Sequence, residues 1–320
     1  MRCKICGNAI KNHSYIVREM MFGTREKFAY FQCSSCECLQ INEIPKNLDD
    51  YYPIEYYSFK THNSLKNRNL FKFIRNKLRD RYSIFRKGFL GKFFYKRSPK
   101  DLHPMLSKVN PTENTSILDV GCGNGKLLMK LSDIGFRNLQ GVDPYIREDI
   151  ILKNGVSILK KDIHDVVGKW DIIMFNHSYE HVTDPVKTLK STFNALTDFG
   201  VCIISVPTVS SHAWEEYREN WVQLDAPRHL FLHSLKSIEF LAEQSNLILE
   251  DVVYDSSDFQ FWGSEQYIKD IPLFDSMSYK LNRKNSIFTK FQIDEYKKKA
   301  DELNKNKRGD SCAFFLRKKL

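Results

Sequence analysis

Short apolar runs alternate with helical patterns along the second half of the chain. An apolar run over 116–120 is followed by leucines at helical spacing in 126–131. Further runs of strand length lie at 138–143, 156–159, 170–175, 201–207, 247–253 and 312–316. Alternation of strands and helices is typical of a parallel sheet covered by helices. The pattern therefore predicts an α/β fold with a doubly wound, seven-stranded, Rossmann-like sheet.

Helix-start signals support this order of elements. Asp184 followed by Pro185 is a typical pair of N-cap and first-turn residues, and Ser234 precedes a second apolar-periodic segment, 235–244. A polar stretch over 258–308 interrupts the alternation between the last two predicted strands. We therefore predict an insertion there, and the sequence assigns it no role.

Three glycines follow the first predicted strand at every second position. Gly121, Gly123 and Gly125 separate that strand from its helix, and Asp119 lies two residues before the first of them. Glycines let the backbone approach a ligand closely and adopt φ values that other residues avoid. The spacing G-x-G-x-G differs from the dinucleotide pattern G-x-G-x-x-G. It therefore favours a nucleotide ligand that has no pyrophosphate.

This loop resembles the first motif of the class I S-adenosylmethionine (SAM)-dependent methyltransferases, an acid followed by alternating glycines. The resemblance implies that SAM is the cofactor, with its ammonium group near Asp119. It also implies a sheet in the order 3-2-1-4-5-7-6, with the last strand antiparallel. Asp143 lies 22 residues beyond Gly121, where a carboxylate can accept hydrogen bonds from both ribose hydroxyls.

The same resemblance places the adenine at the corner after the third strand. There Asp162 would accept from the exocyclic amine, and Ile163 would offer its backbone amide to the ring. The predicted cofactor-binding residues are Asp119, Gly121, Cys122, Gly123, Gly125, Asp143, Pro144, Asp162, Ile163 and Asn176.

Five of the eight cysteines lie in the first forty residues. Two C-x-x-C pairs, Cys3 with Cys6 and Cys33 with Cys36, are spaced as in structural zinc sites, where four thiolates close a tetrahedron. Cys38 is a spare or an alternative ligand. The apolar runs between the pairs predict short strands, so residues 1–45 are expected to form a small zinc ribbon with structural Zn²⁺. Free thiols are the alternative.

The loop after the fourth strand carries His177, Glu180 and His181. The spacing H-x-x-E-H also occurs in one class of zinc proteases, but that pattern requires a helix, and here it follows a strand. The segment resembles the loop ending in Glu-His-Val of ubiquinone-type and sugar methyltransferases. That resemblance implies a catalytic role for Glu180 and His181 and a substrate contact for His177, in some relatives with a divalent ion. A helix-capping cluster is the alternative.

A polar and aromatic loop follows the fifth strand. It resembles the acceptor-side insert of zinc-ribbon methyltransferases of surface-glycan and nucleotide-sugar pathways. Arg228 could hold a phosphate or carboxylate with two hydrogen bonds, and Asp225 offers an acceptor beside it. His229 could accept a hydroxyl proton, because its reference pKa of about 6.5 suits neutral pH. Trp214 could stack on a sugar ring. A salt-bridged loop that only stabilises the corner is the alternative.

Positive charge is concentrated between the predicted ribbon and the sheet. Residues 60–100 contain fourteen Lys or Arg and one acid, a net charge of +13 against +10 for the whole chain. Apolar residues recur at helical spacing in 68–87, which predicts a basic amphipathic helix. This helix could pack on the protein core, lie on an anionic membrane surface or bind RNA phosphates. Alternation with large apolar residues favours a membrane over nucleic acid.

Composition limits the remaining choices. No apolar run approaches the ~18 residues of a membrane span, and the first residues contain no apolar signal core. We therefore expect a cytoplasmic protein, peripheral to the inner membrane face if the basic helix binds lipid. The expected organisation is a ribbon over 1–45, an aromatic and basic helical linker over 46–110, and a methyltransferase domain over 111–320.

The sequence therefore predicts transfer of the SAM methyl group to a hydroxyl of a sugar or glycan-pathway intermediate, with His229 or His181 as the base. An rRNA methyltransferase with a zinc module is the alternative enzyme, and the basic charge favours it. A zinc adaptor that retains the fold without catalysis is a third possibility, against which the complete glycine loop argues.

Overall fold

The computed structural model describes residues 1–52, 70–98, 100–152 and 154–319. Two compact units divide the described chain. One unit, called unit 1 below, draws on Met1–Pro53, His177–Phe193 and Ile204–Leu320, and unit 2 draws on Ile54–Asn176 and Asn194–Ile203. Each unit is therefore assembled from segments that are distant in the sequence.

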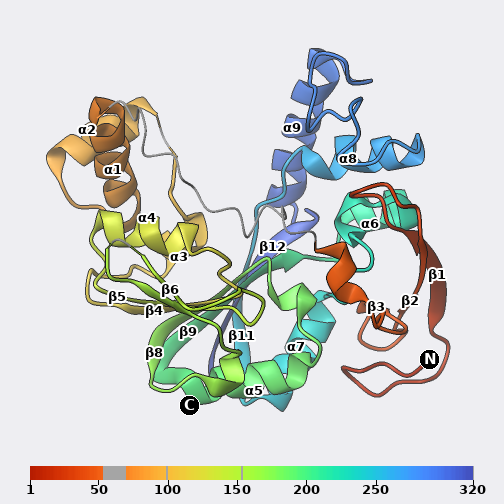
Figure 1. The fold of residues 1–320 in the computed structure, drawn as a ribbon, viewed down its shortest axis with the longest axis horizontal. Helices are drawn as coiled ribbons and strands as arrows, with labels where there is room; N and C mark the ends of the chain where they lie inside the picture. Colours follow the sequence, from red (N-terminus) through yellow and green to blue (C-terminus); the bar gives the residue numbers. More distant parts are fainter. Residues whose placement is uncertain (53–69, 99, 153, 320) are drawn as a thin grey trace. The chain divides into compact units, whose positions relative to one another are not determined.

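Unit 2 contains the parallel strands that the sequence predicts. The strand β4 (Ser116–Val120) pairs with β5 (Asn138–Val142) on one side and with β8 (Trp170–Asn176) on the other. On the far side of β5 lies β7 (Ser157–Leu159), also parallel. The helix α4 (Lys126–Ile134) lies along one face of these strands (Figure 1).

Within the described residues, the central sheet has eight strands, in the order β11-β12-β9-β8-β4-β5-β7-β6. It is mixed, because β11 (Leu247–Tyr254) and β12 (Ser311–Lys318) are antiparallel to each other. The long strand β9 (Leu196–Pro207) runs through both units. The prediction of seven strands is therefore wrong by one.

The additional strand is β6 (Ile150–Ile151), which pairs antiparallel with β7 at the edge of the sheet. Next to this pair, the Gly155 amide donates to the Leu152 carbonyl (2.9 Å), and Gly155 has a φ of 83°. Ile150 also packs against the apolar cluster of Leu128 and Ile158 under α4. Two residues are too few to produce a recognisable strand pattern in the sequence.

The predicted basic helix is α1 (Leu70–Phe85), and a second helix, α2 (Phe89–Arg97), follows it. The two pack closely, since a Cβ on Gly91 would lie 2.6 Å from the Leu78 carbonyl oxygen. A short helix, α3 (Pro104–Lys108), leads into β4. Residues 68–69 of the predicted helix lie outside the described residues.

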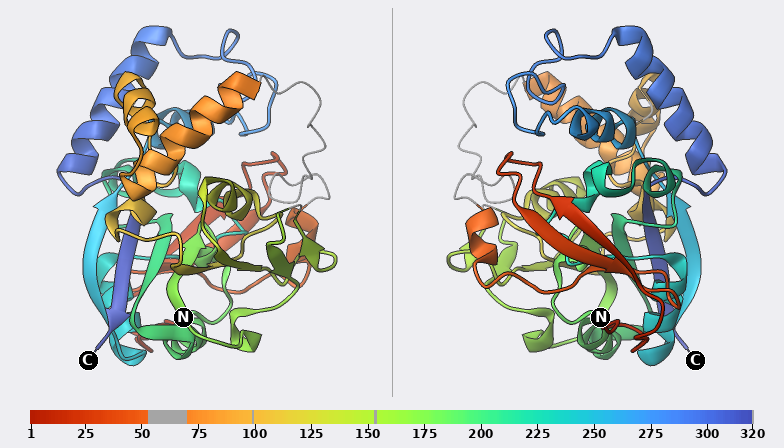
Figure 2. Two further views of the ribbon diagram at one scale, coloured as in Figure 1. Left: turned by 90° about the vertical axis from the view of Figure 1, so that its left-hand side faces the viewer. Right: turned by 90° about the vertical axis from the view of Figure 1, so that its right-hand side faces the viewer.

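Unit 1 contains a second sheet in the order β1-β2-β3-β10. The strands β1 (His13–Arg18) and β2 (Lys27–Gln32) form an antiparallel hairpin, seen side by side in both views of Figure 2. The strand β3 (Leu39–Ile41) follows, and β10 (Phe231–Leu232) pairs antiparallel with it. The cysteine-rich segment is therefore extended by a strand from the loop that the sequence assigned to the acceptor.

The other described helices complete the fold. The predicted insertion over 258–308 contains two of them, and Gly263 in the first is packed against Val222. The α-helices are α5 (Pro185–Ala195), α6 (His212–Tyr217), α7 (Leu235–Gln244), α8 (Phe259–Ile268) and α9 (Lys290–Lys305); the 3-10 helices are η1 (Leu48–Tyr51), η2 (Ile163–Asp165), η3 (Tyr179–His181), η4 (Arg218–Asn220) and η5 (Val222–Leu224). Among the described residues, every helix is too short or too polar to cross a membrane.

Candidate functional site

The glycine loop of unit 2 connects β4 to α4 in a conformation that side chains disfavour. Gly121, Gly123 and Gly125 have φ values of 72°, 54° and 69°. A Cβ on Gly125 would also overlap the side chain of Ile158. Side chains at these three positions would be strained, and at Gly125 one would also clash, so the loop depends on glycine for this conformation.

Asp143 holds the loop in place from the end of β5. One carboxylate oxygen accepts from the Gly123 amide (2.8 Å), and the other accepts from the Tyr145 amide (2.9 Å). A carboxylate is also the type of group that accepts hydrogen bonds from ribose hydroxyls. The structure thus brings together the two motifs that the sequence selected.

Asp119 lies at the end of a hydrogen-bonded chain that the sequence did not predict. The Asn176 amide donates to the Asp119 carboxylate (3.3 Å), and the Asn176 side-chain oxygen lies 3.0 Å from His103 Nε2. Because that oxygen only accepts, His103 carries its proton on Nε2, and its Nδ1 accepts from the Leu106 amide (3.1 Å). His103 therefore orients Asn176, and it caps α3 at the same time.

Burial controls the charge of Asp119. The carboxylate is 3% exposed, and burial together with the nearby Asp143 raises its pKa to about 7, against the lowering effect of Asn176. Without a ligand, ionised Asp119 is poorly compensated. An ammonium group bound beside it would restore that compensation.

The remaining predicted cofactor residues line the ends of neighbouring strands in unit 2. Burial raises the pKa of the Cys122 thiol, which keeps it neutral. Pro144 is exposed next to Asp143. Asp162 caps η2 by accepting from the His164 amide (3.1 Å), and the side chain of Ile163 is buried beneath it. Asp162 is thus half-exposed at the predicted adenine corner.

A cluster of one carboxylate and three histidines lies in unit 1. Glu180 is fully buried, and neither of its oxygens has a hydrogen-bond partner among the described residues. His177 Nδ1 and His229 Nε2 lie 3.7 and 3.8 Å from Glu180 Oε1, which are ion-pair separations. Burial acts to raise the pKa of Glu180, but the histidines, including His181, outweigh it and lower that pKa to about 2.

Hydrogen bonds fix the orientation of two of these histidines. His229 Nδ1 lies 2.7 Å from the Gln223 carbonyl oxygen, and His181 Nδ1 lies 2.8 Å from the Arg228 carbonyl oxygen. A carbonyl oxygen only accepts, so both Nδ1 atoms carry protons and both neutral rings have the lone pair on Nε2. Burial lowers the pKa of His229, which keeps that lone pair available near neutral pH.

Arg228 is enclosed within unit 1. Its guanidinium donates to Asp225 (2.6 Å) and to Glu19 (2.9 Å), and it also contacts the Tyr51 carbonyl oxygen (3.3 Å). The side chain is fully buried. These partners occupy the fork that the sequence assigned to a substrate. Arg228 and Asp225 therefore hold the loop that carries His229.

Glu19 also belongs to this network, although no sequence pattern pointed to it. Its two oxygens accept from the backbone amides of residues 21–24 (2.9–3.1 Å), as well as from Arg228. The Tyr52 hydroxyl, 3.2 Å from His181 Nδ1, was also missed as an individual contact. Tyr56 and Tyr57 of the same aromatic segment lie outside the described residues.

Trp214 is buried between aromatic rings of unit 1. Its ring centroid lies 5.0 Å from that of Tyr15 and 6.2 Å from that of Trp221. Its indole nitrogen donates to Gln32 (3.4 Å). This placement gives Trp214 a packing role in the described structure, and it leaves little ring surface for a sugar.

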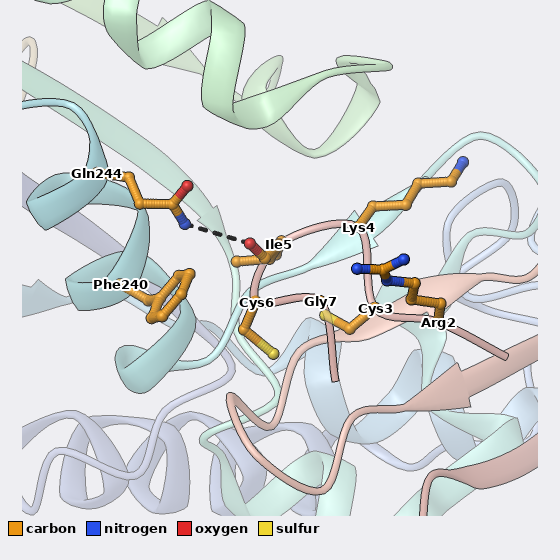
Figure 3. Close-up of a pocket in the computed structure, with 8 residues that line it drawn as sticks. All are labelled: Arg2, Cys3, Lys4, Ile5, Cys6, Gly7, Phe240 and Gln244. Atoms are coloured by element: carbon orange, nitrogen blue, oxygen red, sulfur yellow. Dashed lines mark hydrogen bonds between the residues drawn. The ribbon is translucent and has the colours of Figure 1, made fainter. Parts of the chain in front are cut away.

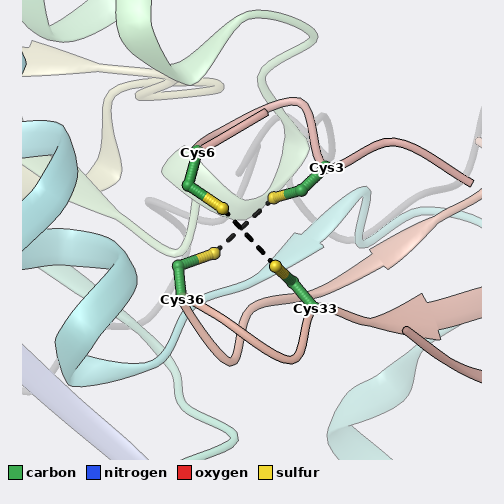
Figure 4. A group of neighbouring side chains, drawn as sticks. All are labelled: Cys3, Cys6, Cys33 and Cys36. Atoms are coloured by element: carbon green, nitrogen blue, oxygen red, sulfur yellow. Dashed lines mark hydrogen bonds between the residues drawn. The ribbon is translucent and has the colours of Figure 1, made fainter. Parts of the chain in front are cut away.

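The four predicted metal ligands converge at one point (Figure 4). The sulfurs of Cys3, Cys6, Cys33 and Cys36 all lie within 4.8 Å of one another. Bonds of about 2.3 Å in a Zn²⁺ tetrahedron place sulfurs about 3.8 Å apart, and the pairs Cys3–Cys36 and Cys6–Cys33 are separated by 3.6 and 3.5 Å. The donor set therefore fits Zn²⁺ with four thiolates.

Neighbouring groups contact these sulfurs. Gln40 donates to the Cys3 sulfur (3.1 Å). The contact between Cys3 and Cys36 lowers the pKa of Cys3 to about 4 and raises the pKa of Cys36, so a proton is held between the two sulfurs. Thiolates are the form of cysteine that binds metal. A hollow of about 600 Å³ borders this cluster. It lies between the Cys3–Cys6 pair and Phe240 of α7 (Figure 3). Arg2 and Lys4 give the hollow a basic wall.

A second group could share a cation. The ligand atoms of Glu180, His181 and His229 also lie within 4.8 Å of one another. One carboxylate and two imidazoles are a common donor set for divalent ions. Without an ion, the same three groups provide two imidazoles, either of which could act as a base, next to a carboxylate.

Comparison with known proteins identifies the family. A family model described as "Methyltransferase domain" matches residues 83–252, which is more than half of the chain. The match begins inside the segment that the sequence assigned to a linker. It includes the glycine loop, Asp143 and the Glu180 cluster.

Two curated relatives match shorter segments. A Saccharomyces cerevisiae protein named "Ubiquinone biosynthesis O-methyltransferase, mitochondrial" is 25% identical over 141 residues, covering 40% of this chain and 45% of the relative. A Campylobacter hominis protein named "tRNA U34 carboxymethyltransferase" is 30% identical over 106 residues, covering 30% of this chain and 37% of the relative. The chain thus spans less than half the length of the curated relatives it matches.

Among solved structures, a SAM-dependent methyltransferase from Mesorhizobium loti is similar with a TM-score of 0.41 and 15% identity. The alignment covers 67% of this chain and 96% of that one.

Proposed function

We propose a reaction for this chain from one premise: it belongs to the methyltransferase-domain family. Its expected activity is methyl transfer from SAM to a hydroxyl group of a sugar or glycan-pathway intermediate. The observation that carries the choice of a hydroxyl is the Nε2 lone pair of His229, which lies 3.8 Å from a buried carboxylate.

Unit 2 would hold the cofactor. The glycine loop presents its backbone, Asp143 would accept from the ribose hydroxyls, and Asp119 would compensate the ammonium group. SAM supplies an electrophilic methyl group on a positively charged sulfur. No phosphate-binding groups are needed for such a ligand, in agreement with the spacing of the glycines.

Unit 1 would supply the base. A hydroxyl becomes a better nucleophile as its proton is removed, and general-base catalysis of this kind contributes about 10²–10⁴-fold in rate. The proton would pass from the acceptor oxygen to His229 Nε2, and Glu180 would stabilise the resulting imidazolium. The His181 ring would be the second imidazole beside this base, since its centroid lies 4.9 Å from that of His229. Asn176 of the cofactor site and His177 of this cluster are consecutive residues.

We also propose that residues 1–45 form a zinc ribbon with a structural role. The four thiolates leave no coordination position for a substrate. Pairing of β10 with β3 and the contact of Arg228 with Glu19 connect the ribbon to the loop that holds His229.

The acceptor class is tested by methyl transfer from labelled SAM. The protein would be incubated with nucleotide sugars, with a small phenolic acceptor and with tRNA and rRNA, and the methylated product would be analysed by mass spectrometry. The proposal expects an O-methylated sugar whose formation requires His229. Methylated RNA, or a methyl group on nitrogen or carbon, would overturn the proposed acceptor and would leave the family assignment intact.

A further inference from the structure

The hairpin of α1 and α2 in unit 2 exposes large apolar side chains at matching positions of its two helices. On α1 these are Leu70, Phe71 and Ile74, and on α2 they are Phe89, Leu90 and Phe93. In each helix they occupy positions i, i+1 and i+4, which share one face. Phe71 and Phe89 are 71% and 83% exposed. Exposure of such large apolar side chains to water is unfavourable, so we expect a binding partner to cover them when the protein functions.

The opposite side of α2 is the one that packs on α1. Gly91 approaches the Leu78 carbonyl and the Tyr82 side chain, and the Tyr82 and Tyr95 rings lie 5.5 Å apart. Gly91 and Tyr95 are two and six residues after Phe89, on the other face of the helix. The exposed apolar residues of α2 are therefore not part of the hairpin's own interface.

Basic residues surround these apolar faces. Residues 70–97 contain ten Lys or Arg and one acid, a net charge of +9. Arg79 and Arg81 are paired with Asp80 and Glu113. The exposed basic residues are Lys72, Arg75, Lys77, Arg86, Lys87, Lys92, Lys96 and Arg97. The Arg97 guanidinium lies over the Phe93 ring, 4.6 Å from its centroid, so its stem follows the apolar surface while its charge remains near water.

We propose that this hairpin docks the protein on an anionic lipid surface. The apolar side chains enter the boundary between headgroups and acyl chains, and the lysines and arginines contact the negative headgroups. Leu70, Ile74 and Leu90 favour lipid over RNA, because single-stranded RNA is bound by flat rings that stack on bases and by polar grooves. The proposal does not depend on the acceptor or on the base.

Co-sedimentation of the whole protein with vesicles tests this proposal. Vesicles with about 30% phosphatidylglycerol would be compared with pure phosphatidylcholine vesicles in low salt, and a sample without vesicles would correct for self-association. Binding to the anionic vesicles is expected to exceed binding to the neutral ones at least about tenfold. It is also expected to weaken as salt is raised, since salt screens exposed charges.

Matched variants distinguish vesicle binding by the hairpin from nonspecific adsorption of the protein to vesicles. The double variant Phe71→Ser and Phe89→Ser is expected to lose at least about fivefold in vesicle binding. Phe291→Ser on α9, where the phenylalanine is 74% exposed, is expected to bind like the wild type. Circular dichroism and binding of S-adenosylhomocysteine would show that each variant is folded.

Three results would overturn the proposal. The first is equal binding to anionic and neutral vesicles, or no binding to either. The second is undiminished binding of the folded double variant. The third is tight binding of tRNA in a mobility-shift assay, lost in the double variant, with no binding to vesicles; the hairpin would then be an RNA-binding surface.

Discussion

At the scale of one residue, Asp119 is the proposed partner of the SAM ammonium group. Its carboxylate is buried beside Asp143, and its pKa is raised to about 7. Since the folded-state pKa lies above the ordinary value of about 3.9, the unliganded fold loses stability as pH rises from about 4 to about 7, where the unfolded carboxyl group is ionised and the folded one still holds its proton. A bound ammonium group favours the ionised form, so ligand binding should release a proton.

SAM affinity should therefore decrease as pH falls from 8 to 6. Isothermal titration calorimetry in buffers of different ionisation enthalpy would measure both the affinity and the released proton. Asp119→Asn should weaken binding about tenfold at pH 8, by removing one charge interaction, and should abolish this pH dependence. Glu148→Gln, an exposed acid of unit 2, is the control. An unchanged pH dependence in Asp119→Asn would exclude this role of Asp119.

His229 should control the chemical step and not cofactor binding. We predict that His229→Gln lowers kcat by about 10²–10⁴ and leaves the SAM affinity unchanged, whereas His13→Gln, an exposed histidine, has no effect. Because burial lowers the pKa of His229, kcat measured at saturating SAM should remain constant at neutral pH and should fall only below about 6.5. A profile that falls already above pH 7 would argue against His229 as the base.

The sequence predicted that the glycine loop and Asp143 lie together, and it did not predict the surroundings of Arg228 and Trp214. Asp143 and the glycines form a local motif, so spacing along the chain was sufficient to place them together. Arg228 and Trp214 looked available in the sequence, but their partners Glu19 and Tyr15 are about 200 residues away. His103 was missed because its role depends on Asn176, which lies 73 residues further along the chain at the end of β8.

At the scale of elements, the cysteine-rich segment and the acceptor-side loop form one structure. The strand β10 extends the ribbon's sheet, and the Ser234 hydroxyl at the start of α7 donates to the Cys36 carbonyl (2.5 Å). The sequence predicted the hairpin strands and the two C-x-x-C pairs, because both kinds of pattern involve residues close together in the chain. Two-residue strands such as β10 and β6 have no such pattern.

Metal removal should therefore affect catalysis as well as stability. We predict one Zn²⁺ per chain, measured by elemental analysis, and its loss in Cys36→Ser. That loss should lower the melting temperature by about 5 °C or more and should reduce kcat more than SAM affinity. Cys38→Ser is the control, since Cys38 is buried beside the cluster but is outside the four-ligand group. One Zn²⁺ retained in Cys36→Ser would contradict the assigned site.

Arg228 should be a major stabilising connection between the ribbon and its neighbouring loop. Its removal leaves two buried carboxylates, Glu19 and Asp225, without a counter-charge. Breaking a buried pair in this way costs about 3–5 kcal/mol. Urea unfolding of Arg228→Met should show a loss of this size. Arg317→Met, which breaks an exposed pair with Glu250, should cost less than about 1 kcal/mol. Equal losses in the free energy of unfolding for the two variants would show that Arg228 does not stabilise this connection.

At the scale of the whole molecule, the predicted boundaries of ribbon, linker and sheet differ from the two compact units. Unit 1 takes its segments from the beginning, the middle and the end of the chain. Local sequence patterns cannot reveal such an arrangement, because it depends on contacts such as those between β3 and β10. The fold class could be predicted from the alternation of strands and helices, and the mixed sheet agrees with it.

The central claim is that the glycine loop and Asp143 of unit 2 bind SAM. Isothermal titration calorimetry with S-adenosylhomocysteine, the demethylated product, tests it most directly. We predict binding with one site per chain for the wild type and for Glu148→Gln, and at least about a tenfold loss for Asp143→Ala. Absence of binding to the wild type, or undiminished binding to folded Asp143→Ala, would contradict the account.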